Sequence, residues 1–132
     1  MRHYPYRMSD FKSLEVWQVA HELTLATFRI SRPLWSDDGQ IVRKQLLRAA
    51  ISIPANIAEG SGKQSDADFV RFLRISMGST SETEYHLILA VDLELIKRED
   101  GEALIDRAIQ VRKMLSGLIK FLQSAPKKRK KP

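Results

Sequence analysis

The sequence predicts an all-α fold, an antiparallel four-helix bundle with up-down-up-down order. Apolar residues recur at helical spacing in four stretches, and no alternating strand pattern runs for more than a few residues. The 132 residues suit one domain with one core, and six Gly and five Pro are too few for a turn-rich β-sandwich. We expect the bundle to occupy residues 1–126 and a separate tail to occupy residues 127–132.

The first helix is expected over residues 14–30, with Ser13 as its N-cap and Pro33 just beyond its end. Apolar side chains fall on two opposite faces of this helix. One face holds Leu14, Trp17, Leu25 and Phe28, and the other holds Val16, Val19, Ala20, Leu23, Ala26 and Ile30. Because one bundle covers only one of these faces, we expect another copy of the chain to cover the second.

The second helix is expected over residues 38–59, with Ser36 as its N-cap. Pro54 lies inside it and removes one backbone donor, so we expect a kink there. Ser52 is the candidate partner for the carbonyl that Pro54 leaves free. Gly60, Ser61 and Gly62 are expected to end the helix, with Gly60 in a left-handed conformation.

The third helix is expected over residues 66–97, where Ser65 and Asp68 approximate a capping box. Its middle is rich in small residues around Gly78, which favours close approach to a neighbouring helix. The fourth helix is expected over residues 102–123. Its core stripe at bundle spacing consists of Leu104, Ala108, Val111, Leu115, Leu118 and Leu122.

The net charge of +6 is distributed unevenly along the chain. Residues 82–106 hold two basic and eight acidic residues, whereas residues 107–132 hold nine basic residues and no acidic one. The run 127–131 repels itself, so we expect it to be disordered. It suits a polyanion, because each phosphate contact releases counterions. A tail that only improves solubility is the alternative interpretation.

The predicted topology gathers the start of the first helix, the 60–65 loop and the end of the fourth helix at one end of the bundle. This basic end would be the docking face for nucleic acid. The candidate nucleic-acid-binding residues are Lys12, Lys63, Arg112, Lys113, Lys120, Lys127, Lys128, Arg129, Lys130 and Lys131. A second polar set, Arg48, Asn56, Glu59, Arg71 and Arg74, is interpreted either as hydrogen bonds and ion pairs across helices or subunits, or as a ligand-facing patch.

Motifs for catalysis and cofactor binding are weak. The segment EGSGKQS differs from a phosphate-binding loop, because Gln64 follows Lys63 and a helix precedes it. The absence of Cys excludes a thiolate zinc site, and His3, His21 and His86 are too scattered for a metal pattern. We therefore expect no enzymatic activity, cofactor or metal. The chain opens with no signal peptide and has no apolar run of about 18 residues, so we expect a cytoplasmic protein without a membrane partner.

Three stretches together resemble a known family: FKSLEVWQVAHEL at 11–23, RAAISIPANIAEGSGKQSDADFVRFLRISMGSTSETEYHLILA at 48–90, and RKMLSGLIKFLQS at 112–124. They are similar to the bacterial 23S rRNA intervening-sequence proteins, also labelled S23 ribosomal proteins. The resemblance implies a four-helix protomer, a ring-like homopentamer and a link to nucleic acid, without enzymatic activity. Related accessory proteins of diversity-generating retroelements are thought to bind RNA and a reverse transcriptase.

These observations lead to an expected function. The chain is predicted to be a non-enzymatic, oligomeric accessory protein that binds RNA or DNA, with RNA favoured. The alternative is a scaffold whose assembled surface binds another protein, for example a reverse transcriptase.

Overall fold

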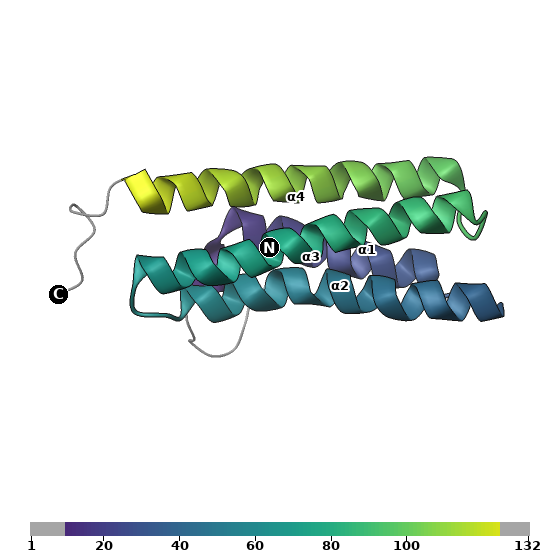
Figure 1. Cartoon of the computed structure of the whole chain (residues 1–132), viewed down its shortest axis with the longest axis horizontal. Helices are drawn as coiled ribbons and strands as arrows, with labels where there is room; N and C mark the ends of the chain where they lie inside the picture. Colours follow the sequence, from purple (N-terminus) through teal and green to yellow (C-terminus); the bar gives the residue numbers. More distant parts are fainter. Residues whose placement is uncertain (1–9, 125–132) are drawn as a thin grey trace.

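The computed structural model describes residues 10–124, which form a bundle of four helices (Figure 1). A short 3₁₀ helix, η1 (Asp10–Ser13), leads into α1 (Glu15–Ser31), which is followed by α2 (Asp37–Ser61), α3 (Asp66–Asp92) and α4 (Arg98–Ser124). In Figure 1, α1 and α3 run in one direction and α2 and α4 in the other. No strand occurs within the described residues. The predicted all-α bundle is confirmed.

Within the bundle each helix packs against two neighbours: α2 packs on α3, α3 packs on α4, and α1 contacts both α2 and α4. The core is built from all four helices. It contains Val16, Ala20 and Leu23 of α1, Leu46, Ile53 and Ile57 of α2, Val70, Leu73 and Leu87 of α3, and Leu104, Ala108, Val111, Leu115, Ile119 and Leu122 of α4. Leu118 of the predicted stripe is half-buried and packs against the edge of this core. A straight helix with 3.6 residues per turn drifts from a strict seven-residue repeat, and Ile119 comes to face the core instead.

Two of the three predicted N-caps are confirmed. The Gly39 amide donates to Ser36 Oγ at 3.0 Å, and the Asp68 amide donates to Ser65 Oγ at 3.1 Å. The prediction for Ser13 is wrong. Its hydroxyl donates to the Asp10 carbonyl at 2.7 Å within η1, and Leu14 takes the N-cap position of α1 without a side-chain bond.

The boundary between α3 and α4 differs from the prediction. α3 ends at Asp92 rather than at residue 97, and α4 begins at Arg98 rather than at residue 102. Glu94 adopts a left-handed conformation with φ of 61°. The Glu94 and Leu95 amides donate to carbonyls of the last turn of α3, which closes the helix. No Gly, Pro or Asn marks this position in the sequence, so local residue preferences do not indicate it.

α2 ends within the predicted segment 60–62, with Gly62 as its C-cap, but the predicted left-handed conformation of Gly60 is wrong. The helix continues to Ser61, Gly60 is buried within it, and no described glycine has a positive φ. A Cβ atom on Gly60 would lie 2.7 Å from Phe72 Cβ and 2.9 Å from Phe69 Cδ1. The missing side chain therefore lets α3 approach α2 closely.

The small residues in the middle of α3 also pack closely on α2, but Gly78 does not take part. The Ser76 hydroxyl donates to the Ile53 carbonyl at 2.9 Å, and the Ser79 hydroxyl donates to Ser52 Oγ at 2.8 Å. Gly78 is exposed, and a Cβ atom there would meet no other atom within 4 Å. The prediction that a side chain at Gly78 would obstruct helix packing is wrong within the protomer.

Pro54 lies inside an otherwise continuous α2, and its missing N–H leaves the Ala50 carbonyl without its helical donor. The Thr24 hydroxyl of α1 supplies a donor instead, 3.1 Å from the Ala50 oxygen and 2.9 Å from the Ala20 oxygen. Ser52, the residue predicted for this role, interacts with Asn56 and Ser79. The Thr24 hydroxyl of α1 thus replaces the backbone donor that Pro54 lacks.

This replacement can be tested by a double-mutant cycle. Thr24→Val removes the hydroxyl and should lower the free energy of unfolding by about 1–3 kcal/mol, because the buried Ala50 carbonyl loses its donor. In a Pro54→Ala background the new amide of residue 54 can bond to that carbonyl, so Thr24→Val should cost measurably less. Urea unfolding of the four proteins measures both costs. Equal costs in the two backgrounds would contradict the assignment.

A pair of glycine substitutions tests the packing of α2 on α3. Gly60→Ala should lower the free energy of unfolding by about 1–3 kcal/mol through overpacking against Phe72. The matched change Gly78→Ala should raise it by roughly 0.5–1 kcal/mol, because alanine is the better helix former at an exposed site. Thermal unfolding of both variants compares the signs, and a stabilising Gly60→Ala would show that the two helices are not in close contact there.

Candidate nucleic-acid interface

The fold brings the predicted basic end together. The start of α1, the connection between α2 and α3, and the end of α4 lie at the same end of the bundle (Figure 1). Lys12 belongs to η1, Lys63 to the connection and Lys120 to the last turns of α4. The predicted residues Lys127, Lys128, Arg129, Lys130 and Lys131, and the predicted disorder of residues 127–132, lie outside the described residues. The chain reaches them directly from the end of α4.

The predicted cations differ in the contacts that they make with other side chains of the protein. Lys63 Nζ lies 3.2 Å from Glu59 Oε2 and 5.2 Å from the centre of the Phe72 ring. Lys12 Nζ lies 5.3 Å from the centre of the Phe11 ring. Arg112 Nη1 lies 2.6 Å from Glu84 Oε1, so this residue joins α4 to α3 in a half-buried ion pair. Lys113 and Lys120 are exposed.

The basic excess of the chain is located outside the described residues. Residues 10–124 contain all 16 acidic residues but only 15 of the 22 basic ones. The other seven basic residues lie in 1–9 and 125–132, which contain no acidic residue. The bundle itself is therefore nearly neutral, and its basic surfaces have to be found from the positions of individual side chains.

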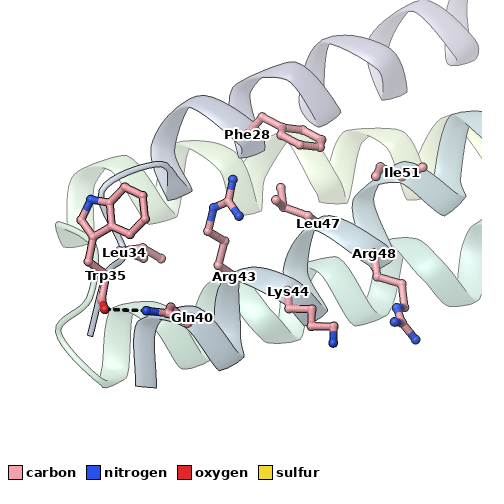
Figure 2. Close-up of a pocket in the computed structure, with 9 residues that line it drawn as sticks. All are labelled: Phe28, Leu34, Trp35, Gln40, Arg43, Lys44, Leu47, Arg48 and Ile51. Carbon is pink, nitrogen blue, oxygen red and sulfur yellow. Dashed lines mark hydrogen bonds between the residues drawn. The ribbon is translucent and has the colours of Figure 1, made fainter. Parts of the chain in front are cut away.

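A second basic surface, absent from the predicted set, lies at the opposite end of α2. A cavity of about 490 Å³ opens between the end of α1, the connection at 32–36 and the first half of α2 (Figure 2). We call it the α1–α2 groove. It is lined by Phe28, Leu34, Trp35, Gln40, Arg43, Lys44, Leu47, Arg48 and Ile51. The lining thus contains three cations, two aromatic rings and no carboxylate.

The connection that carries Trp35 is held in place by its neighbours. Leu34 is buried, and its amide donates to the Ser31 carbonyl at 3.2 Å. The Gln40 side-chain amide donates to the Trp35 carbonyl at 2.8 Å (Figure 2). Gly39 packs under this connection, where a Cβ atom would lie 3.1 Å from Leu34 Cβ. The backbone is therefore fixed, while 78% of the surface of Trp35 remains exposed.

Arg43 reaches from α2 into this groove. Figure 2 shows its guanidinium group between Trp35 and Leu47, while Lys44 and Arg48 extend from α2 on the side away from Phe28. Arg43 Nε is shielded from solvent and has no hydrogen-bond partner among the described residues. A buried donor without an acceptor is unfavourable by about 1–3 kcal/mol.

Within residues 10–124, the second polar set does not form the contacts across helices that the first interpretation predicts. Glu59 pairs with Lys63, Arg71 lies 3.8 Å from Asp68, and Asn56 bonds to Ser52, so these contacts lie within helices or their ends rather than across them. Arg48 lines the groove, and Arg74 is exposed. A sequence signal for the groove does exist: a tryptophan between Pro33 and the Ser36 cap, followed by Lys44 and Arg48 at helical spacing.

Residues 10–124 contain neither a candidate metal site nor a helix that could span a membrane. No group of three or more His, Asp or Glu side chains in this range is placed to hold a metal ion. None of the helices in this range is both long enough and apolar enough to cross a membrane.

Comparison with known proteins adds a family to this description. The family model described as 23S rRNA-intervening sequence protein matches residues 12–117. A similar solved structure is the crystal structure of a protein with unknown function from the S23 ribosomal protein family of Bacteroides thetaiotaomicron. It is 33% identical, with a TM-score of 0.74, and the match covers 80% of this chain and 98% of that one. No curated protein matches. The chain, with its four-helix fold, therefore belongs to the 23S rRNA-intervening sequence protein family.

Proposed function

We propose that this protein is a non-enzymatic accessory protein that binds nucleic acid, with RNA as the favoured ligand. The observation that carries the proposal is the separation of charge between the bundle and the chain ends. Residues 10–124 are nearly neutral, whereas the short segments on either side hold seven basic residues and no acidic one. Such segments bind phosphates by releasing counterions and need no folded partner surface.

The position of the basic run supports docking at one end of the bundle. Residues 127–131 follow α4 after a short spacer, and the exposed Lys120 lies in the last turns of that helix. Lys113, which is also exposed, lies two turns before Lys120 on α4. Because lysine and arginine contacts to phosphate carry no base information, binding at this end would tolerate many sequences. The family name, which refers to 23S rRNA, favours RNA over DNA.

Self-association forms the second part of the proposal. Of the two apolar faces predicted for the first helix, one is buried in the core through Val16, Ala20 and Leu23. The other remains half-buried, and Leu14 and Trp17 lie on it at the start of α1. A second copy would cover this face, and the family resemblance implies five copies in a ring. A dilute sample that sediments at the mass of one chain would contradict this part.

A protein-binding scaffold is the second candidate function, and a specific surface favours it. The outer side of α3 exposes three large apolar side chains, Ile75, Tyr85 and Ile88. Tyr85 and Ile88 are neighbours three positions apart on this helix, and adjoining exposed apolar residues are typical of a protein interface. A partner such as a reverse transcriptase would then dock on α3, and the basic end would serve only solubility.

Removal of residues 127–132 distinguishes the two functions. RNA affinity should fall, and the slope of log K against log salt should shrink by about 0.7–0.9 for each phosphate that the shortened chain no longer binds. Fluorescence anisotropy at several salt concentrations measures both quantities. The melting temperature and sedimented mass should not change, because the core stripe of α4 ends at Leu122.

The control for this truncation is a full-length variant with Lys97→Gln and Arg98→Gln, which removes two exposed cations at the opposite end of the bundle. It should retain the wild-type salt slope. If the truncated protein binds RNA as well as the full chain, the basic run is not the docking segment; if the full chain does not bind near physiological salt, the scaffold function takes precedence.

A further inference from the structure

We propose that the α1–α2 groove is a binding site for a short segment of single-stranded nucleic acid. An unpaired base would stack on Trp35, the nearest phosphate would bind Arg43, and the strand would continue along α2 toward Lys44 and Arg48. This inference rests on the proposed nucleic-acid-binding function and adds a specific site and the single-stranded form of the ligand. The site lies at the far end of α2 from Lys63.

The aromatic ring is the first observation that supports it. Trp35 is 78% exposed, more than any other large apolar side chain in the described part of the chain. Its backbone is nevertheless fixed by the buried Leu34 and by the bond from Gln40. A ring that is exposed on a rigid support can stack with a ligand without a large loss of conformational entropy. Base–aromatic stacking also tolerates any base, since every base has a π face.

The charge of the groove is the second observation. Its lining has three cations and no carboxylate, and none of the three forms an ion pair with a described residue. Asp37 and Asp38 stand in the first turn of α2 but are not part of the lining. Cations that flank an exposed aromatic ring are the combination that single-strand-binding surfaces use.

The buried Nε atom of Arg43 is the third and independent observation. This donor is shielded from solvent and has no acceptor among the described residues. Figure 2 draws the guanidinium group of Arg43 between Trp35 and Leu47, on the side of α2 that faces the groove. The terminal nitrogens of the same guanidinium, rather than the covered Nε, are the groups that would bind a phosphate oxygen, because arginine binds phosphate through charge-assisted hydrogen bonds.

The form of the ligand follows from these features. The cavity of about 490 Å³ falls within the range of sites for small-molecule-sized groups, which run from about 300 to 1,000 Å³. A nucleotide of a single strand presents a free base face beside its phosphate. In a duplex the base faces are stacked inside, where Trp35 cannot reach them without unpairing. An acidic peptide would use the cations but leave the exposed indole ring without a planar partner.

The test uses the full-length protein and a fluorescein-labelled RNA of ten uridines, with anisotropy as the readout. Trp35→Ala should weaken binding about 5- to 150-fold, the range expected for loss of one stacked base. Trp35→Phe keeps a stacking ring and should recover most of the affinity. Arg43→Gln should weaken binding and reduce the salt slope by about 0.7, because one phosphate is no longer bound by a cation.

Matched controls remove the same kinds of side chain elsewhere. Tyr85→Ala deletes an exposed aromatic ring on α3, and Arg107→Gln deletes an exposed cation on α4. Both should bind the RNA within about twofold of the unchanged protein. Unlabelled RNA should also quench tryptophan fluorescence in the wild-type protein and in the truncation that lacks residues 127–132, but not in Trp35→Phe.

The outcomes separate this site from the general function. RNA binding by the full chain with unchanged affinity in Trp35→Ala and Arg43→Gln would overturn the groove site and leave the proposed function standing. Absence of RNA binding by the full chain would overturn both.

Equal competition by a ten-base-pair duplex would overturn the single-stranded form of the ligand. Equal competition by decaglutamate would overturn the nucleic-acid ligand in favour of an acidic protein partner. If a groove variant changes the sedimented mass but not the RNA affinity, the groove does not bind a ligand. It is then an interface between copies of the chain.

Discussion

The close packing of α2 between α1 and α3 sets the positions of the other parts of the molecule. Two buried hydroxyl groups donate to backbone carbonyls of α2, Thr24 from α1 and Ser76 from α3. Gly60 removes the side chain that would otherwise keep Phe72 of α3 at a distance. Buried polar groups need partners, so these bonds fix the register of three helices more narrowly than apolar packing alone.

Both candidate binding surfaces depend on this packing because they lie at the two ends of α2. At its start, α2 contributes Arg43 and Leu47 to the groove, opposite Phe28 of α1. At its end, Glu59 pairs with Lys63, which also lies over the Phe72 ring of α3. Arg43 in the groove stands 18 residues before Ser61, the last residue of α2, which corresponds to roughly 27 Å along the helix. One bundle can therefore present a sequence-tolerant phosphate surface and a base-stacking site that do not overlap.

Much of this fold could be predicted from the sequence, because the determining signals are local. Helical spacing identified four helices, and the Ser36 and Ser65 caps follow from bonds that reach only three residues along the chain. The turn at Glu94 could not be predicted, since a residue that rarely adopts positive φ stands there. Gly60 was misinterpreted because a glycine near a helix end serves equally for a left-handed cap or for close packing, and only the position of Phe72 distinguishes the two roles.

The candidate site was harder to predict, because tertiary structure creates it. Phe28 and Ile51 line one groove although 23 positions separate them, and the exposure of Trp35 runs against the usual burial of tryptophan. Arg112 shows that tertiary contacts can also occupy a residue that the sequence suggests for binding. It was chosen from a basic stretch, yet Glu84, 28 positions away, already binds it.

Hydrogen exchange of the full-length protein, with and without the ten-uridine RNA, tests the central claim most directly. The claim is that nucleic acid binds at the two ends of α2. Amides of loops and frayed helix ends exchange fastest in the free protein, so protection there is readily measured. RNA should slow exchange at residues 32–44, around the groove, and at residues 60–65 and 118–124, around the basic end. Protection confined to residues 74–88 of α3, or no change at any position, would contradict the account.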